Sequence, residues 1–358
     1  MKTTTNTQQG FLKNLIDIEP YIAGEQPKND DIIKLNANEN PYEPSPMVKK
    51  AIAEFSSNEL NKYPSADSDI LRQALARKFS LTPEHFFIGN GSDDVLALAF
   101  RAFFNSDKPI IYPEITYSFY PVWCKMFDIP YKTFKLRDDF DIDVNDFCSE
   151  NGGVVLANPN APTAICQNLG FVREVIERNP DSVVIVDEAY IDFGNESAIK
   201  LVKEYDNLCV VQTFSKSRSL AGLRIGYACC GKALMPALRA AKDSYNSYPL
   251  DSVALVAGTA SVMDEEYFIA TTQKVVRTRE RVSKELKDLG FEMTNSATNF
   301  LFATHPQKTA LEIKNYLADN NVYIRHFNKE GISNYLRITI GTDEQMDIMT
   351  DLLKKLFK

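Results

Sequence analysis

The segment that decides the fold is Thr213–Tyr227, with the sequence TFSKSRSLAGLRIGY. It follows a short apolar run, Leu208 to Val211, whose length and β-branched content predict a buried strand. Lys216 stands among hydroxyl residues at the exit of this strand, and Arg224 follows in the same segment. A lysine in a polar loop is ordinarily solvated. Here the small and apolar residues after Ser219 and the nearby cation favour a lysine that loses its proton easily, as an imine-forming nucleophile must.

Further apolar runs resemble that strand and alternate with segments of helical length. The strands predicted are Phe86–Ile88, Pro109–Tyr112, Gly153–Ala157 and Val183–Val186, with helices over 47–55, 68–79 and 95–104. Near-continuous apolar strands separated by helices are typical of a largely parallel sheet that is covered on both faces. The sequence therefore predicts an α/β fold.

The chain after Tyr248-Pro249 has a different pattern. A long helical tract is expected over 251–289, and the strands Asn299–Ala303 and Tyr335–Ile340 flank a predicted helix over 309–318. This combination predicts a second, smaller α+β domain. Near the start of the chain, 34–46 is dense in turn-forming residues and is expected to be an extended linker.

The bulk composition disfavours several classes of protein. The 358 residues carry a formal net charge of −8 without a long basic block, so neither nucleic acid nor an anionic membrane surface is an expected partner. The six cysteines have the spacing neither of a metal site nor of a secreted disulfide framework, which favours a reducing, cytoplasmic location. We find no apolar run with the length of a signal-peptide core or of a membrane span.

Polar side chains follow the predicted strands, at the place where ligands bind in open parallel sheets. In chain order they are Ser92 and Asp93, Tyr117, Asn160, Asp187 and Tyr190, and Ser215 and Lys216. Most have an ordinary structural explanation, such as an N-cap for Ser92 or turn chemistry for Asn160. Asp187 is harder to explain in this way, because a carboxylate after four β-branched residues needs a partner. Together these residues predict a binding site.

The chemistry of this set matches the ring of pyridoxal phosphate. Lys216 would form an imine with the cofactor, and Asp187 would keep the pyridine nitrogen protonated so that the ring accepts electrons. Asn160 and Tyr190 would bond the phenolic oxygen of the ring, and Tyr117 would stack on its face.

A second group of residues is suited to the cofactor's phosphate. The helix N-terminus at Ser92 and Asp93 would supply oriented N–H groups, Ser215 a hydroxyl and Arg224 a fixed cation. Thr213 completes the predicted cofactor-binding set at the end of the same strand.

A P-loop ATPase is the competing interpretation from another class. Val184–Glu188 has the form of an acidic strand end, and Gly226–Ala233 matches G-x-x-x-x-G-K up to its last position. Ala233 replaces the hydroxyl residue that a magnesium ion needs, and the glycine-rich stretch follows the acidic strand instead of preceding it. Both departures disfavour this alternative.

The chain resembles the fold-type I pyridoxal-phosphate aminotransferases and, within them, the histidinol-phosphate aminotransferase branch. The likeness extends over nearly the whole chain, and Lys216 to Gly226 is its most specific part. The matching motifs are Pro20-Tyr21 with Gly24, Leu35–Pro41, Tyr63-Pro64, Gly89–Asp93, Asn158–Asn160, Val186–Tyr190, Ser215-Lys216, Gly222–Gly226, Thr298–Phe300 and Leu336–Gly341.

This resemblance implies a domain organisation and an assembly. A large domain over 46–247 would hold a mostly parallel sheet flanked by helices, and a small α+β domain would combine 1–45 with 248–358. The resemblance also implies a homodimer whose active sites lie at the subunit interface, with Tyr63 reaching the cofactor phosphate bound by the other subunit.

The resemblance further implies how substrates bind. Arg325 and Arg337 match the positions that hold the substrate's phosphate or the carboxylates of glutamate and 2-oxoglutarate. Tyr21 and Asn160 would help to form the pocket for the substrate.

The implied reaction is the transfer of an amino group between L-histidinol phosphate and 2-oxoglutarate in histidine biosynthesis, with Lys216, Asp187 and Tyr190 as the catalytic set. An aromatic amino-acid aminotransferase and a threonine-phosphate decarboxylase remain alternatives, because each needs the same cofactor groups and an anion clamp.

One departure from the family's sequence motif is visible. The family's Asn-Pro-Asn-Asn-Pro-Thr-Gly appears here with Ala161 and Ala164, which retains Asn160 as ring-oxygen ligand but leaves the exact substrate preference open.

Overall fold

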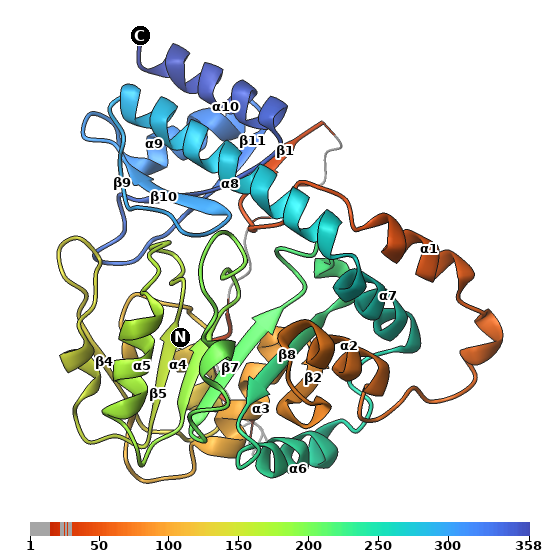
Figure 1. The fold of residues 1–358 in the computed structure, drawn as a ribbon. Helices are drawn as coiled ribbons and strands as arrows, with labels where there is room; N and C mark the ends of the chain where they lie inside the picture. Colours follow the sequence, from red (N-terminus) through yellow and green to blue (C-terminus); the bar gives the residue numbers. More distant parts are fainter. Residues whose placement is uncertain (1–14, 22–24, 26, 28–30) are drawn as a thin grey trace, which may run out of the picture.

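Two β-sheets of different construction organise the chain (Figure 1). The computed structural model describes residues 15–21, 25, 27 and 31–358. Gly24 and residues 1–14, which belong to the predicted small domain, lie outside the described residues. The division of the chain at residues 45 and 247 stays a prediction.

The larger sheet is mostly parallel, and this confirms the predicted α/β class. Its spatial order is β2-β8-β7-β6-β5-β3-β4, and β8 runs antiparallel to both of its neighbours while the other six strands share one direction. The strands are β2 (Phe86–Asn90), β3 (Ile110–Pro113), β4 (Tyr131–Phe134), β5 (Gly153–Ala157), β6 (Val184–Asp187), β7 (Leu208–Thr213) and β8 (Ile225–Cys230).

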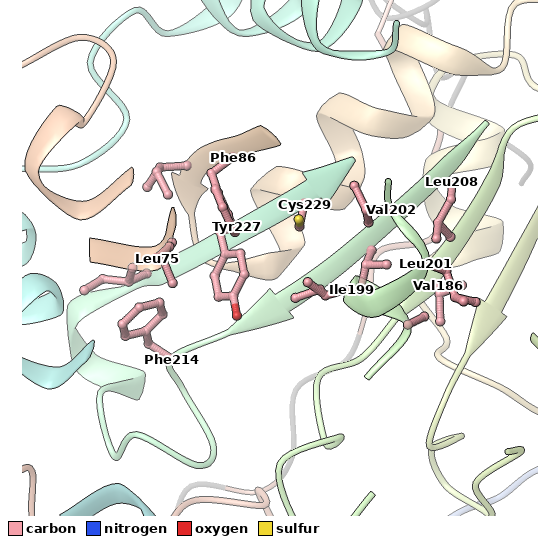
Figure 2. Close-up of a cluster of buried hydrophobic side chains, with 14 of the residues drawn as sticks. Leu75, Phe86, Val186, Ile199, Leu201, Val202, Leu208, Phe214, Tyr227 and Cys229 are labelled. Carbon is pink, nitrogen blue, oxygen red and sulfur yellow. The ribbon is translucent and has the colours of Figure 1, made fainter. Parts of the chain in front are cut away.

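Helices cover both faces of this sheet, as near-continuous apolar strands require. Val184 and Val186 belong to one hydrophobic core and Ile185 to the other. Figure 2 shows part of the first core, in which the rings of Phe214 and Tyr227 meet at 5.9 Å between centroids. The helices beside the sheet are α1 (Pro46–Glu54), α2 (Asp69–Phe79), α3 (Ser92–Phe103), α4 (Tyr120–Met126), α5 (Leu169–Glu177), α6 (Met235–Tyr245) and α7 (Ser252–Met263).

The smaller sheet joins the two ends of the described chain. Its order is β1-β11-β12-β10-β9, and β1 pairs in parallel with β11 although 34–46 was expected to be a linker. The strands are β1 (Ile33–Leu35), β9 (Glu292–Met293), β10 (Phe300–Thr304), β11 (Val322–His326) and β12 (Leu336–Thr339), and the helices are α8 (Glu265–Asp288), α9 (Ala310–Asp319) and α10 (Asp343–Leu356).

The helical tract expected over 251–289 is divided into α7 and α8 at Asp264. The Asp264 carboxylate accepts a hydrogen bond from the backbone N–H of Tyr267, so this residue caps the second helix. Buried side chains of α7, such as Leu255, pack into the core of the larger sheet. No helix in the described part of the chain is long and apolar enough to cross a membrane.

Candidate active site

A cavity of about 1470 Å³ lies at the carboxyl ends of the parallel strands, and residues of both sheets line it. This is the edge at which open α/β sheets bind ligands. The predicted site residues that line the cavity are Tyr21, Ser92, Asp93, Tyr117, Asp187, Tyr190, Thr213, Ser215, Lys216, Arg224, Arg325 and Arg337.

Asp187 ends β6 and is almost completely buried, with 5% of its surface exposed. The hydroxyl of Tyr120 donates to its carboxylate over 2.8 Å, and the backbone N–H of Ala189 donates over 3.3 Å. Burial raises the pKa of Asp187 to about 6, and these two hydrogen bonds oppose the rise. Burying a charged carboxylate away from water costs free energy, so Asp187 is suited to pair with a cation that enters the cavity.

Lys216 extends into the same cavity from the loop after β7. Its Nζ donates to the backbone carbonyl of Ala37 over 3.3 Å, and the side chain of Asn40 donates to the Lys216 carbonyl over 2.9 Å. Burial, together with the positive charge of Arg337, lowers the pKa of Lys216 to about 8. This amine therefore loses its proton more easily than a solvated lysine, as a nucleophile requires.

Tyr190 lies directly beneath this amine. Its hydroxyl accepts a hydrogen bond of 2.9 Å from the side-chain amide of Asn38, and its ring meets Phe300 edge to face at 5.0 Å. Burial raises the pKa of Tyr190, while the charge of Arg337 and the bond from Asn38 act against the rise. The phenol is thus protonated at neutral pH and faces the cavity.

An anion-binding cradle forms where α3 begins. Gly91, at φ +86°, allows the guanidinium of Arg224 to lie over this helix end, since a Cβ at Gly91 would stand 2.7 Å from an Arg224 nitrogen. Asp93 accepts a hydrogen bond of 2.8 Å from Tyr117 and lies 3.4 Å from Arg224. A helix N-terminus beside a fixed arginine is suited to a phosphate group.

The strand end of β7 adds hydroxyl groups to this cradle. The Thr213 hydroxyl donates to the Ser215 hydroxyl over 2.9 Å and accepts from the Ser215 backbone N–H over 3.1 Å. The Ser215 hydroxyl proton remains available to a ligand. In the neighbouring strand, a Cβ at Gly226 would stand 2.3 Å from the Ser92 nitrogen. The glycine-rich stretch that resembled a P-loop is therefore the buried strand β8, packed against the start of α3.

Two arginines face the cavity from the smaller sheet. Arg325 on β11 and Arg337 on β12 are direct neighbours in the sheet register. Arg337 donates to the backbone carbonyl of Asn36 over 3.0 Å, but its buried Nε has no hydrogen-bond partner among the described residues. Like charges opposite each other are unfavourable unless an anion lies between them. The pair therefore predicts an anionic substrate group at this side.

Tyr21 borders the same side of the cavity. Its ring stacks on Phe119 with centroids 4.4 Å apart and lies 6.4 Å from Tyr117. It is still 38% exposed, so it forms a wall of the cavity instead of part of the core.

Asn160 differs from the other predicted residues in that its side chain is engaged by its own loop and by the loop after β3. Its side-chain N–H groups donate to the Ile115 carbonyl and the Thr163 hydroxyl, and its oxygen accepts from Thr116. These contacts use both N–H groups and one lone pair of the oxygen, so Asn160 holds the loop together, and Ala161 beside it lines the cavity. Its role toward the ring oxygen of the cofactor stays a prediction.

Tyr63 lies apart from the cavity within its own chain. It is 82% exposed and stacks on Tyr248 with ring centroids 4.6 Å apart. Its predicted contact with a cofactor phosphate would thus have to be made to another subunit.

Three residues of the site were not predicted as such. Tyr120 is the nearest polar partner of Asp187, and Asn38 and Asn40 contact Tyr190 and the Lys216 backbone. The asparagines were visible as the repeated Asn-x-Asn pattern in 36–40, but nothing in that pattern says which distant side chains they contact. Tyr120 falls inside a helix and reads as a core aromatic.

Comparison with known proteins gives a consistent result. Residues 30–353 match the model of the family "Aminotransferase class I and II". A histidinol-phosphate aminotransferase of Lactococcus lactis is 50% identical over 96% of this chain and 97% of its own, and one of Acinetobacter baylyi is 47% identical over 99% of each. The crystal structure of a histidinol-phosphate aminotransferase from Sinorhizobium meliloti, in complex with pyridoxal-5'-phosphate, has the same fold. It superposes with a TM-score of 0.80 at 24% identity, over 90% of this chain and 91% of that one.

Proposed function

The chain belongs to the class I and II aminotransferases, and we propose on this premise that Lys216 and Asp187 act in one cavity to catalyse amino transfer from L-histidinol phosphate to 2-oxoglutarate. The products are imidazole acetol phosphate and glutamate. The protein is a pyridoxal-phosphate-dependent transaminase, and relatives of about half-identical sequence over nearly the full length carry the histidinol-phosphate specificity. The observation that carries the proposal is the placement of an easily deprotonated lysine, a buried carboxylate and two adjacent arginines around the same space.

The residues of the cavity fit pyridoxal phosphate. The cradle of Gly91, Ser92, Ser215 and Arg224 suits a phosphate group, and the buried carboxylate of Asp187 suits a protonated pyridine nitrogen. When bound, the cofactor supplies an electron-accepting ring that stabilises negative charge at the substrate carbon.

The catalytic work of the chain then falls on a few side chains. Lys216 would hold the cofactor through its amine, and its free amine would move the proton at the reacting carbon of the substrate. Asp187 would hold the proton on the ring nitrogen, and its burial would strengthen this charge interaction because little water competes. Tyr190 and Tyr117 both line the cavity. The Tyr190 hydroxyl would donate toward the ring oxygen, and the Tyr117 ring would pack on one face of the cofactor ring.

Substrate recognition is assigned to the smaller sheet and to the wall of Tyr21. Arg325 and Arg337 would bind the phosphate of histidinol phosphate in one half-reaction and a carboxylate of 2-oxoglutarate in the other. The unpaired Nε of Arg337 supports this role, because a buried donor without a partner is costly until a ligand accepts from it. Tyr21 would contact the imidazole ring of the substrate.

The active unit is proposed to be a homodimer. Support comes from Tyr63, Tyr248 and Tyr245, three aromatic side chains that are 82%, 42% and 81% exposed. Aromatic residues are enriched in protein interfaces. In this assembly Tyr63 reaches the cofactor phosphate of the other subunit.

The six cysteines are free thiols, which supports a cytoplasmic location for the enzyme.

A half-reaction screen tests the substrate. Purified enzyme with bound cofactor is mixed separately with histidinol phosphate, tyrosine, phenylalanine and threonine phosphate, and the visible spectrum is followed in a stopped-flow instrument. Histidinol phosphate is expected to convert the cofactor to its aminated form fastest. Faster conversion by tyrosine or phenylalanine would identify an aromatic aminotransferase, and release of carbon dioxide from threonine phosphate would identify a decarboxylase.

A further inference from the structure

The hydroxyl of Tyr190 is held by a residue far away in the sequence. The side chain of Asn38 donates to the Tyr190 oxygen over 2.9 Å. Among the described residues, no other hydrogen bond is found at this hydroxyl. A phenol that accepts a hydrogen bond on its oxygen keeps its own single proton for another acceptor. Since Tyr190 lines the cavity, that proton is available there.

Asn38 is itself fixed in one orientation. Its backbone N–H donates to the hydroxyl of Thr339 over 3.0 Å, and that hydroxyl donates back to the Asn38 side-chain oxygen over 3.2 Å. The Asn38 carbonyl accepts from the side chain of Asn299 over 3.0 Å. With its oxygen engaged by Thr339, the amide must present its N–H₂ group to Tyr190 and cannot present its oxygen.

The backbone at Asn38 requires a particular residue type. Its φ is +55°, in the left-handed region that asparagine tolerates better than most side chains, and only 1% of its surface is exposed. A buried asparagine in this conformation, with every polar group engaged, is costly to replace. These contacts also join the smaller sheet, through Thr339 on β12, to the loop that carries Tyr190.

The same strand also carries the predicted anion-binding side chain. Arg337 and Thr339 are two residues apart on β12, so their side chains lie on the same face of the strand. One therefore faces the substrate region of the cavity, and the other holds Asn38. The charged groups that act on Tyr190 are Arg337, Asp187 and Asp93, with the Lys216 amine 5.9 Å from its ring centroid.

We propose that Asn38 is a positioning residue of the reaction: held by Thr339, it donates to the Tyr190 oxygen and thereby directs the Tyr190 hydroxyl proton to the cofactor's ring oxygen. This inference rests on the proposed use of pyridoxal phosphate. It does not depend on which amine is the substrate.

The substitution that tests this is Asn38→Asp, which keeps the shape and the bond from Thr339 but replaces the donor with an acceptor. The carboxylate takes the Tyr190 proton for itself, so the ring oxygen loses its donor. A donor at that oxygen favours the deprotonated form of the lysine–cofactor linkage, because this form carries more negative charge there. We expect the pKa of the linkage, titrated by visible absorbance without substrate, to rise by roughly one unit, a tenfold shift of the proton equilibrium.

Two further variants separate the path through Tyr190 from a direct effect of the new charge. Tyr190→Phe removes the donor outright and is expected to raise the same pKa to a similar extent. In the double variant Asn38→Asp with Tyr190→Phe, the two shifts should not add, because both remove one interaction. Full additivity, or an unchanged pKa in Asn38→Asp, would overturn the proposal.

The chain offers a matched control in Asn195. Its side-chain amide also bridges to the C-terminal part of the chain, donating to the Ala297 carbonyl over 2.8 Å, but it does not contact Tyr190. Asn195→Asp should leave the pKa of the linkage unchanged, and a rise equal to that of Asn38→Asp would contradict our proposal.

If Asn38→Asp does not fold, Asn38→Gly removes the donor while accommodating the positive φ, and it should shift the pKa upward as well. A wild-type protein whose cofactor cannot be trapped on Lys216 with borohydride would instead refute the proposed function.

Discussion

The Nζ of Lys216 lies 5.9 Å from the centroid of the Tyr190 ring. The two groups come from different strand ends, β7 and β6, which pair in parallel and so deliver both side chains to one edge of the sheet. A cofactor that is attached to Lys216 is thereby placed within reach of a phenol before any substrate arrives.

Lys216→Ala is expected to abolish turnover and covalent attachment while the cradle still binds cofactor noncovalently. Borohydride treatment followed by mass spectrometry should add a reduced cofactor to the wild type and not to this variant. Lys34, which lines the same cavity and pairs with Glu39 over 2.9 Å, provides the control, because Lys34→Ala should still be labelled. Substantial steady-state activity in Lys216→Ala would show that another group performs the proton transfer.

The pKa of about 8 at Lys216 predicts how fast the apoenzyme takes up its cofactor. Only the neutral amine attacks, so the rate constant should rise about tenfold per pH unit and level off near pH 8. A free lysine derivative, titrated with the same cofactor, should continue to rise toward about pH 10.4, and changes in the cofactor itself are common to both series. Stopped-flow absorbance measures each rate. Coincident profiles would mean that the site does not lower the pKa of this lysine.

Asp187 should make the apoenzyme less stable as the pH rises. Burial raises its pKa from 3.8 to about 6, so its contribution to stability is fully present below pH 3.8 and is lost as the pH rises through about 6. The loss is at most about 3 kcal/mol, from 1.36 kcal/mol per unit. Asp187→Asn should reduce the fall in the free energy of unfolding between pH 4 and 6, measured by urea titration, and weaken the stabilisation of the protein by cofactor. Part of the fall should remain, because burial also raises the pKa of the adjacent Glu188, to about 7.

The matched control for this prediction is Asp181→Asn, which changes an exposed carboxyl group. Its unfolding free energy should follow the wild-type pH dependence. If Asp187→Asn retained the full wild-type slope, the ionisation of Asp187 would not be the cause.

A complementation experiment tests whether Tyr63 acts between subunits. Homodimers of Lys216→Ala and of Tyr63→Ala are each expected to lose most activity. A heterodimer of the two, isolated with different affinity tags, should regain one complete site, in which Lys216 of one chain meets Tyr63 of the other. If Tyr63 served the cavity of its own chain, the heterodimer would have no complete site and would remain as weak as its parents.

The sequence was sufficient to predict the larger sheet and most of the site. Strands such as Gly153–Ala157 are apolar throughout because both faces are covered, and this signal is local. The residues that follow them, including Asp187 and Lys216, then meet by topology alone. Both therefore could be assigned without any knowledge of distances.

The features of the fold and the site that the sequence did not predict depend on contacts between distant segments of the chain. Ile33–Leu35 is short and lies among turn-forming residues, so its pairing with Val322–Ile324 leaves no pattern in the sequence. The contacts of Asn160 were also not readable from its motif, since side-chain direction in a loop is set by neighbours such as Thr116 and Thr163. Sequence pattern predicts which residue types meet at a sheet edge more securely than which of two adjacent residues faces the ligand.

The bond between Asn38 and Thr339 spans 301 positions of the chain. At a synthesis rate of about 5–20 residues per second, Thr339 emerges from the ribosome roughly 15–60 seconds after Asn38. Lys216 and Tyr190 are both made within that interval, so the nascent chain comes to hold them before it has the group that fixes the asparagine. If Asn38 acts as we propose, the cofactor pocket is therefore complete only after β12, the last strand of the described chain, has been synthesised.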